Sequence, residues 1–397
     1  MGTFEEDILK RVKEDHNYIV NLRRHFHKYP EIAKEEKNTC LKIEEELDNI
    51  GISHKRVGEY GVAAYIKGNK IGNKKIVLRA DIDALPINEE NDVEYKSIIP
   101  NRMHACGHDS HTASLIGAAR VLNSLKDSFA GEILLSFQQG EEIGYGARIV
   151  VDSGIIDGYD RSFGLHSASY IKTGKIAFTS GPINAAVDFF RIKVNGKAAH
   201  VSTPELGVDA LYIASLIVTS IQGITTRGNS PQEPLLIGIG KLISGDAYNI
   251  IAQSAILEGT IRSFDEEVRV KTKENIESLA KSIASSFGAT IEFEWKDFTS
   301  VLVNDIASTE EAKIVAKDLF GIKNVVEKEK SLGGDDFAEY VKKVKGVYGF
   351  FGTGNPNKKN TTLPHHDNKF DIDEDGLIVS VATYVAYAIR FLKGDIK

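Results

Sequence analysis

Apolar, strand-like runs alternate with amphipathic helical segments along this 397-residue chain, and this alternation limits its fold more than any other feature. Strand patterns occupy Lys75–Arg79, Ile133–Phe137 and Ser162–Leu165, and a helical pattern, Thr112–Leu122, lies between the first two. Short apolar runs separated by helices are typical of a mostly parallel sheet that is covered by helices on both faces. We therefore expect an α/β fold.

The middle of the chain follows a different order. Patterns of strand, helix, strand, strand, helix and strand succeed one another at Val187–Val194, Asp209–Ile224, Leu235–Ile243, Ala255–Phe264, Glu266–Phe287 and Ile291–Trp295. This is the order of a ferredoxin-like α+β unit. After about Thr299 the α/β alternation resumes. We therefore expect a discontinuous α/β domain, residues 1–185 and 299–397, with a smaller α+β domain, residues 186–298, inserted into it.

The composition excludes several classes of protein. Hydrophobic residues make up 42% and charged residues 26% of the chain, as in soluble globular proteins. The net charge is −7 and no block of consecutive Lys or Arg occurs, so we do not expect nucleic acid as a partner. The charged N-terminal segment lacks the apolar core of a signal peptide, and apolar runs such as Leu211–Ile217 are too short to span a bilayer. We expect a cytoplasmic protein with no membrane partner.

The chain has two cysteines, Cys40 and Cys106, too few for a disulfide-stapled secreted fold. We expect Cys40, which falls in an early helical segment, to be an ordinary buried thiol. Cys106 has a different setting and is free to bind a metal in a reducing compartment.

The segment Met103-His-Ala-Cys-Gly-His-Asp-Ser-His111 concentrates groups that bind metals, just before a predicted helix. Packing alone does not account for three histidines, a thiol and a carboxylate in nine positions, because each buried polar side chain would need its own partner. Cys106 and His108 flank a glycine, so both side chains can face one cation. A thiolate with an imidazole favours zinc, manganese, cobalt or nickel over magnesium or calcium.

Other polar side chains follow the predicted strands. Asp83 comes after the first strand, Glu141 and Glu142 after the second, and His166 at the end of the third. Ligands of open α/β sheets bind outside the carboxyl ends of the strands, so we expect these groups to converge on Cys106. Taken singly, each also fits a structural role: the glutamates as a solvated helix start, Asp83 as a turn former, and His166 as a strand-end residue.

Two pairs of adjacent residues extend this set. Glu141 and Glu142 can divide two tasks, since one carboxylate can bind a metal while its neighbour holds a proton for a water molecule. Close to the C-terminus, His365 and His366 offer a further candidate ligand from a distant part of the chain.

Nine short segments, spread in order over nearly the whole chain, carry a family resemblance. They are Arg23-Arg-His-Phe-His-Lys-Tyr-Pro-Glu31, Arg79-Ala-Asp-Ile-Asp-Ala-Leu-Pro86, Met103–His111, Gln138-Gln-Gly-Glu-Glu142, Gly164-Leu-His166, Gly196-Lys-Ala-Ala-His200, Asn249 with Gly259-Thr-Ile-Arg262, Gly334-Asp-Asp-Phe337, and His366 with Phe370. Together they resemble the amidohydrolase branch of the M20 metallopeptidase family, which includes hippurate hydrolases, plant auxin-conjugate hydrolases and N-acetyldiaminopimelate deacetylases. The resemblance implies a phosphorylase/hydrolase-like catalytic domain with an inserted dimerisation (lid) domain.

The resemblance also implies a site for two divalent transition-metal ions (Mn, Zn, Co or Ni). The implied ligands are Cys106, His108, Glu142, His166 and His366. Glu141 would be the general acid and base. His366 is preferred to His365, whose role stays open, because the family's ligand lies four positions before a Phe, here Phe370.

Further residues gain roles from the same resemblance. Asp83 and Asp109 would orient metal ligands, and Asp81 could do the same or cap a turn. In the insert, His200 would reach the active site of the partner in a homodimer and stabilise the oxyanion. Asn249 and Arg262 look suited to holding a substrate carboxylate, for which arginine offers a bidentate fork. The alternative for the insert is a surface histidine and a sheet-edge arginine. The lid is expected to close by rotation near Ala186 and Phe298.

The implied activity is hydrolysis of the amide bond of N-acyl amino acids by a metal-activated water with Glu141 as the base. A dipeptidase or exopeptidase with the same site is one alternative, and a non-catalytic binding protein of the same fold is another. Three positions depart from the family pattern and bear on the pocket's shape. They are Gln139-Gly140 where Pro-Ala is usual, Asp335 where Glu is common, and Asp367-Asn368 where a Pro is usual.

Overall fold

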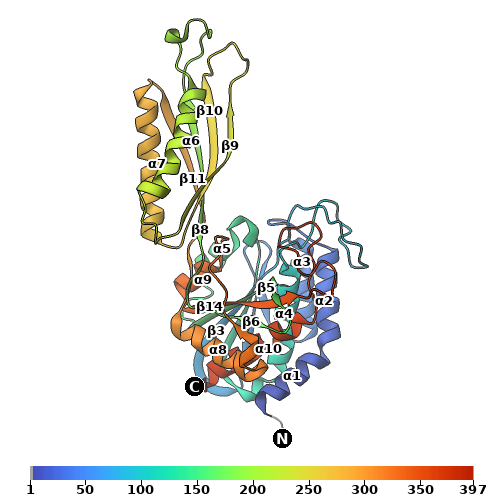
Figure 1. The fold of residues 1–397 in the computed structure, drawn as a ribbon. Helices are drawn as coiled ribbons and strands as arrows, with labels where there is room; N and C mark the ends of the chain where they lie inside the picture. Colours follow the sequence, from blue (N-terminus) through green and yellow to red (C-terminus); the bar gives the residue numbers. More distant parts are fainter. Residues whose placement is uncertain (1–2, 397) are drawn as a thin grey trace. The chain divides into compact units, whose positions relative to one another are not determined.

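An eight-stranded sheet forms the centre of the larger of two structural units in the computed structural model, which describes residues 3–396 (Figure 1). This unit comprises the described residues up to Gly181, together with Val303–Glu329 and those from Asp335 onward. Its strands follow the order β1-β2-β4-β3-β5-β14-β6-β13. Their bounds are β1 His54–Val57, β2 Gly61–Lys67, β3 Lys70–Asp81, β4 Ala130–Gln138, β5 Arg161–Lys172, β6 Ile176–Ala177, β13 Val325–Val326 and β14 Gly346–Gly354.

The four central strands, β4, β3, β5 and β14, run parallel to one another, whereas β1 and β2 add an antiparallel edge. All nine residues of β14 are buried, as expected for a strand covered on both faces. The mostly parallel central sheet predicted from the sequence is therefore confirmed. The antiparallel edge was not foreseen.

Ten α-helices accompany the sheets in the described part of the chain. Those of the larger unit are α1 Phe4–Glu14, α2 His16–Lys28, α3 Lys37–Asn49, α4 His108–Ser124, α5 Gly146–Asp152, α8 Ile306–Phe320, α9 Phe337–Lys343 and α10 Gly376–Lys393. Helices α4 and α10 pack on each other and on β3, while α5 and α9 pack on each other and on β4 and β14. The apolar core between the sheet and α4 and α10 includes Ile76, Leu78, Leu115 and Val385.

Helix α10 is long and apolar enough to cross a membrane by length and composition. However, 89% of it is buried inside the unit, and its residues Tyr384 and Tyr387 are fully buried. This is the environment of a core helix. Its apolar run is interrupted by Ser380, Thr383 and Arg390, so it does not stand out in the sequence as an uninterrupted apolar segment.

The smaller unit contains Pro182–Leu302 and the short segment Lys330–Gly334. Its four-stranded antiparallel sheet has the order β11-β8-β10-β9, with β8 Ala186–Asn195, β9 Leu235–Ser244, β10 Ser254–Ser263 and β11 Thr290–Thr299. Helices α6 Ala210–Arg227 and α7 Glu266–Ser286 lie side by side along these strands (Figure 1). The remaining strands, β7 Gly181–Asn184 and β12 Leu302–Asn304, pair with each other.

Alternation of apolar residues explains this smaller sheet. Along β8 every second residue is buried, and Phe190, Ile192 and Val194 pack with the apolar faces of α6 and α7. Each helix begins at an aspartate, Asp209 or Asp265, whose side chain accepts a backbone N–H of the first turn. The sequence-based boundary of residues 186–298 remains a prediction. Lys330–Gly334 groups with this unit because Ser331 pairs with Asn184 and Arg262 donates to the Leu332 carbonyl at 2.7 Å.

Candidate metal and catalytic site

Strand register brings two of the predicted positions, Asp81 and His166, to the same edge of the central sheet. Asp81 pairs with Gln138 of β4, and Arg79 pairs with Gly164 of β5, so Asp81 and His166 lie at the same level. The prediction that His166 ends its strand is wrong, because β5 continues to Lys172 by pairing with β14. His166 nevertheless lies just beyond the last β3 pairing. It therefore reaches the edge at which β3 and β4 end.

The segment around Cys106 leads directly into α4. The sequence placed the metal-binding groups before the helix, but α4 begins at His108, so His108, Asp109 and His111 lie in its first turns. Gly107 makes this start possible. Its φ of 87° is in the left-handed region, and a Cβ there would lie 2.3 Å from the hydroxyl oxygen of Ser167. Any other residue would therefore clash between Cys106 and His108.

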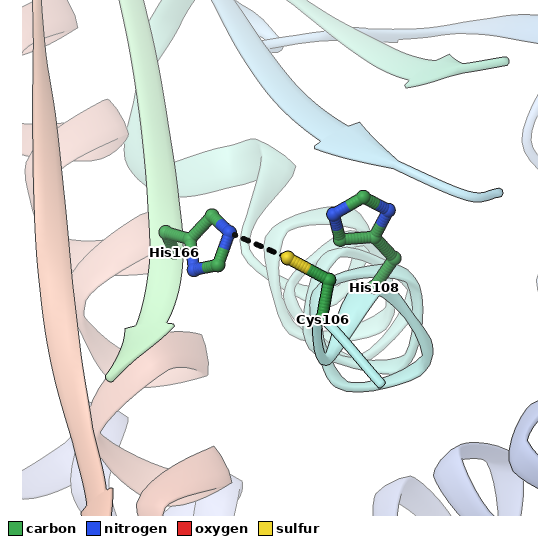
Figure 2. A group of neighbouring side chains, drawn as sticks. All are labelled: Cys106, His108 and His166. Carbon is green, nitrogen blue, oxygen red and sulfur yellow. Dashed lines mark hydrogen bonds between the residues drawn. The ribbon is translucent and has the colours of Figure 1, made fainter. Parts of the chain in front are cut away.

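The donor atoms of five predicted ligands form two overlapping groups. Within each group, the donor atoms lie within 4.8 Å of one another. One group consists of Cys106, His108 and His166 (Figure 2), and the other of Cys106, Glu142 and His366. Cys106 belongs to both, and its sulfur lies 3.6 Å from Nε2 of His166. Glu141 joins His108 and Glu142 in a third group.

Backbone carbonyls hold the two central imidazoles in orientation. His108 donates from Nδ1 to the carbonyl of Asp83 at 2.9 Å, and His166 donates from Nδ1 to the carbonyl of Ser167 at 2.7 Å. In both rings Nε2 is then the nitrogen with a free lone pair. Histidine ligands of metals usually have their second nitrogen fixed in this way.

A loop before the C-terminal helix delivers His366. Its backbone N–H donates to the carbonyl of Ala105 at 2.8 Å, which ties this loop to the Cys106 segment. Its φ of 68° is unusual for a residue with a side chain and marks a constrained position. The His365 ring packs against the rings of His166 and Phe370, with centroids 5.1 and 5.0 Å away, and His365 is not in either donor group. Burial and nearby imidazoles lower the pKa of His365 to about 3.

The electrostatics of the cluster fit a cation. Nε2 of His108 and Oε1 of Glu142 are buried, and neither has a hydrogen-bond partner in the described part of the chain. Burial, Asp335 and Glu142 raise the pKa of Glu141 well above its usual value, and burial and Glu142 do the same for the pKa of the Cys106 thiol. A thiol, two carboxylates and three imidazoles crowded together would gain stability from a bound positive charge.

Asp83 forms hydrogen bonds with three of the predicted site residues. Its buried carboxylate accepts the N–H groups of Glu141 at 3.1 Å and Glu142 at 3.0 Å, and its carbonyl accepts from His108. Asp81 lies beside it in an ion network that also reaches the site, since its carboxylate lies 3.6 Å from Nε2 of His108. It accepts from Arg79 at 2.6 Å and from Nδ1 of His111 at 2.5 Å.

Asp109, in the first turn of α4, is fully buried, and its carboxylate contacts α2. It forms an ion pair with Nε of Arg23 at 2.9 Å and accepts a hydrogen bond from Nδ1 of His27 at 2.7 Å. Despite burial, these two cations hold the pKa of Asp109 far below its usual range. Burial and Arg23 lower the pKa of His27, but the hydrogen bonds with Asp109 and Glu89 outweigh them and raise it to about 9. Asp109 thus anchors the helix turn that carries His108.

A second buried network lies behind Glu141 and was not assigned a role from the sequence. Arg79, fully buried, contacts Asp336 at 2.8 Å and Asp335 at 3.5 Å. The backbone N–H of Asp336 points at Glu141 Oε1 from 3.4 Å, and Gln138 donates to Asp336 at 2.8 Å. The segments Gln138–Glu142 and Gly334–Phe337 were both recognised as motifs in the sequence. Their convergence on Glu141 could not be predicted, because Glu141 and Asp336 are more than 190 residues apart in the chain.

The insert residues lie in the smaller unit, at two ends of one sheet. Exposed His200 bonds with Ser202, and the carbonyl of Asn249 accepts the N–H of Val201 at 3.1 Å, so these two are neighbours. Arg262 pairs with Val187 at the opposite end of β8 and β10. At about 3.3 Å per residue, the stretch of β10 between Ser254 and Arg262 spans about 26 Å. Asn249 and Arg262 of the same copy therefore cannot share one carboxylate.

Known proteins share both the sequence and this fold. The model of peptidase family M20/M25/M40 matches residues 77–390. Thermostable carboxypeptidase 2 of Saccharolobus solfataricus is 41% identical, over 97% of this chain and 98% of its own. N-acetyl-L-cysteine deacetylase of Bacillus subtilis is 37% identical, over 93% of this chain and 86% of its own.

Among solved structures, the YXEP protein of Bacillus subtilis, described as a dinuclear metal-binding peptidase of the M20 family, superposes with a TM-score of 0.83. It is 33% identical, and the alignment covers 96% of this chain and 99% of that protein. The family match covers well over half of the chain, and the relatives match nearly end to end. This chain belongs to peptidase family M20/M25/M40.

Proposed function

We propose that this protein is a metal-dependent amidohydrolase that cleaves the amide bond of N-acyl amino acids. The observation that carries the proposal is the pair of donor groups sharing Cys106, with Glu141 beside them, at the carboxyl edge of the sheet. The substrate is a small molecule, in keeping with relatives named N-acetyl-L-cysteine deacetylase and N-acyl-L-amino acid amidohydrolase. A cytoplasmic location is part of the proposal and is supported by two free cysteines.

The relatives named carboxypeptidase favour a second candidate, an exopeptidase. The two activities are chemically close. A carboxypeptidase and an N-acyl amino acid hydrolase both break the amide bond on the nitrogen of an amino acid whose carboxylate is free. They differ in the group on the acyl side, which is a peptide in one case and a simple acyl group in the other.

Two divalent transition-metal ions would be held by Cys106, His108, Glu142, His166 and His366. The oriented Nε2 atoms of His108 and His166 and the unpartnered oxygen of Glu142 support this ligand set. The soft thiol of Cys106 favours manganese, zinc, cobalt or nickel over magnesium and calcium. When bound, such ions lower the pKa of a water molecule and polarise the substrate carbonyl.

Glu141 moves the protons in this mechanism. Its carboxylate takes a proton from the attacking water as the new C–O bond forms at the carbonyl carbon. It then gives this proton to the amide nitrogen as the C–N bond breaks, which releases a carboxylic acid and an amino acid. Two contacts support this placement of Glu141. Its Oε2 lies 4.0 Å from Nε2 of His108, and its Oε1 accepts the backbone N–H of Asp336 at 3.4 Å.

We further propose that the protein acts as a homodimer through the smaller unit. Strand β9 is at an edge of its sheet, and its Leu236, Leu242 and Ile243 are 40–57% exposed. An apolar edge strand of this kind is suited to pairing with another copy. In a dimer, His200 and Asn249 would serve one site and Arg262 the other, in keeping with their separation along β10. Closure of the smaller unit as a lid belongs to the same proposal.

His200→Ala tests the role of the insert in catalysis. If the imidazole stabilises the oxyanion, the substitution lowers kcat by about 10²–10³-fold, the usual effect of removing one such donor. Steady-state kinetics on the best N-acyl amino acid measure this. Ser202→Ala, which removes only the hydroxyl beside His200, is the matched control and keeps most of the activity. An unchanged kcat/KM for His200→Ala rules out the oxyanion role.

A substrate panel tests the proposed function. N-acetyl and aromatic N-acyl amino acids are compared with dipeptides and tripeptides, with Mn²⁺, Co²⁺ or Zn²⁺ added, and the released amino acid is quantified. We expect the highest kcat/KM among the N-acyl amino acids. A preference for peptides establishes the exopeptidase instead, and no hydrolysis of either class contradicts the proposal.

A further inference from the structure

Three consecutive backbone N–H groups in the turn that carries Glu141 are bound by two buried carboxylates. The N–H groups of Glu141 and Glu142 donate to Asp83, and that of Gly140 donates to Oε1 of Glu36 at 2.8 Å. Asp83 follows β3, whereas Glu36 comes from the loop before α3. Two distant segments therefore hold this turn from opposite ends.

Folding alone does not account for Glu36. Its side chain is 0% exposed, and its second oxygen, Oε2, is buried with no hydrogen-bond partner in the described residues. A buried carboxylate with one unpartnered oxygen costs stability compared with an apolar residue of similar size. Its backbone carbonyl accepts the N–H of Cys40 at 2.9 Å, which fixes it at the start of α3.

Hydrogen bonds within the turn hold the Gly140 carbonyl, which accepts the N–H groups of Tyr145 and Gly146 at 3.2 Å, whereas the Gly140 N–H is held from outside by Glu36. Gly140 has a φ of 63°, in the left-handed region, and lies between the end of β4 and the short 3₁₀ turn Glu141–Ile143. A glycine here leaves the backbone free to rotate. The hydrogen bond that the Gly140 N–H donates to Glu36 restricts this backbone rotation at the residue directly before Glu141.

We infer that Glu36 is a positioning residue for the Glu141–Glu142 pair: by binding the N–H of Gly140, it fixes the direction in which both carboxylates leave the turn. This inference rests on the proposed function of Glu141 and Glu142. Glu36 touches neither substrate nor metal in this account. Glu36 binds the N–H of Gly140 in the same way as Asp83 binds the N–H groups of Glu141 and Glu142.

Two substitutions distinguish the effect of side-chain length at position 36 from the effect of its negative charge. Glu36→Gln keeps an oxygen at the same distance from the Gly140 N–H, whereas Glu36→Asp keeps the charge but is one methylene too short. Glu36→Ala removes both. Glu46→Ala is the matched control, since Glu46 is a 7% exposed glutamate on the adjacent helix that binds Tyr18 and Lys42 instead of the turn.

The readouts are kcat and KM on an N-acetyl amino acid, the Mn²⁺ dissociation constant by calorimetric titration, and the melting temperature. We expect Glu36→Asp and Glu36→Ala to lower kcat and Mn²⁺ affinity by about 10–100-fold, as loss of a group that orients metal ligands usually does. Glu36→Gln is expected to retain most of the wild-type kcat and Mn²⁺ affinity, and Glu46→Ala to change only the melting temperature. Glu36→Asp removes only one methylene, so kcat and Mn²⁺ affinity can be measured on this variant even if Glu36→Ala does not fold.

Positioning is overturned if Glu36→Asp retains wild-type kcat and Mn²⁺ affinity, or if it exceeds Glu36→Gln in both. Measurements on the wild-type protein distinguish failure of the proposed function from failure of the proposed role of Glu36. If it binds Mn²⁺ but hydrolyses no N-acyl amino acid, the proposed function fails, and the Mn²⁺ affinities of the variants still decide the role of Glu36. If it binds no metal, both fail.

Discussion

Replacing Glu141 with Gln is expected to lower kcat by about 10²–10⁴-fold, because a positioned general base contributes about that much to a hydrolytic step. The amide of Gln fills the same volume but cannot accept a proton from water or return one to the leaving nitrogen. KM is expected to change little, since Glu141 is not proposed to hold the substrate. Steady-state kinetics at saturating metal measure both constants.

The metal content of Glu141→Gln should equal that of the wild type, which separates loss of the base from loss of the ions. Glu132→Gln is a matched control, because Glu132 lies near the start of β4, the strand that leads to Glu141, and accepts a hydrogen bond from Tyr159 instead of lining the site. It is expected to keep full activity. Near-wild-type turnover of Glu141→Gln with metal bound would show that another group moves the proton.

Cys106→Ala should abolish most of the activity by emptying the site. Cys106 is the donor that both three-residue groups share, so its loss weakens both. Metal ions contribute several kcal/mol to such reactions, and each 1.4 kcal/mol is tenfold in rate, so we expect kcat/KM to fall by at least about 100-fold. Elemental analysis of the purified variant is expected to show less bound transition metal than in the wild type.

Cys40→Ala provides the control for this cysteine. Cys40 is fully buried in the apolar core beside α3, and its burial raises the pKa of the thiol to about 11, so it is a packing residue. Its replacement is expected to lower the melting temperature while metal content and kcat stay at wild-type values. A Cys106→Ala protein that keeps its metal and its activity contradicts the ligand assignment.

Much of the site could be predicted because parallel strands place their carboxyl ends at one edge. Asp81, Glu141 and His166 each follow or cross that edge, and the Cys106 segment precedes the helix packed against it. The choice of His366 over His365 rested on spacing to Phe370. It agrees with the grouping of His366 with Cys106 and Glu142 and with the packing of His365 against Phe370, though the ligand role of His366 remains a proposal.

Other features could not be predicted because they depend on contacts between distant segments. Glu36 lies in the charged run Lys34-Glu-Glu-Lys37, which is typical of a solvated surface, and only the folded chain shows it buried against Gly140. The convergence of Arg79, Asp335 and Asp336 behind Glu141 has the same origin. The separation of Asn249 from Arg262 required the strand register of β10, which a single sequence does not define.

Hydrolysis by this protein is proposed to depend on metal ions held at Cys106 and its neighbours. Titration of Mn²⁺ into chelator-treated, metal-free protein, followed through release of the amino acid from an N-acetyl amino acid, tests it most directly. We expect no measurable turnover without metal and a saturable rise in kcat as the ions bind. Full activity in the metal-free protein, or metal binding with no gain in activity, would contradict it.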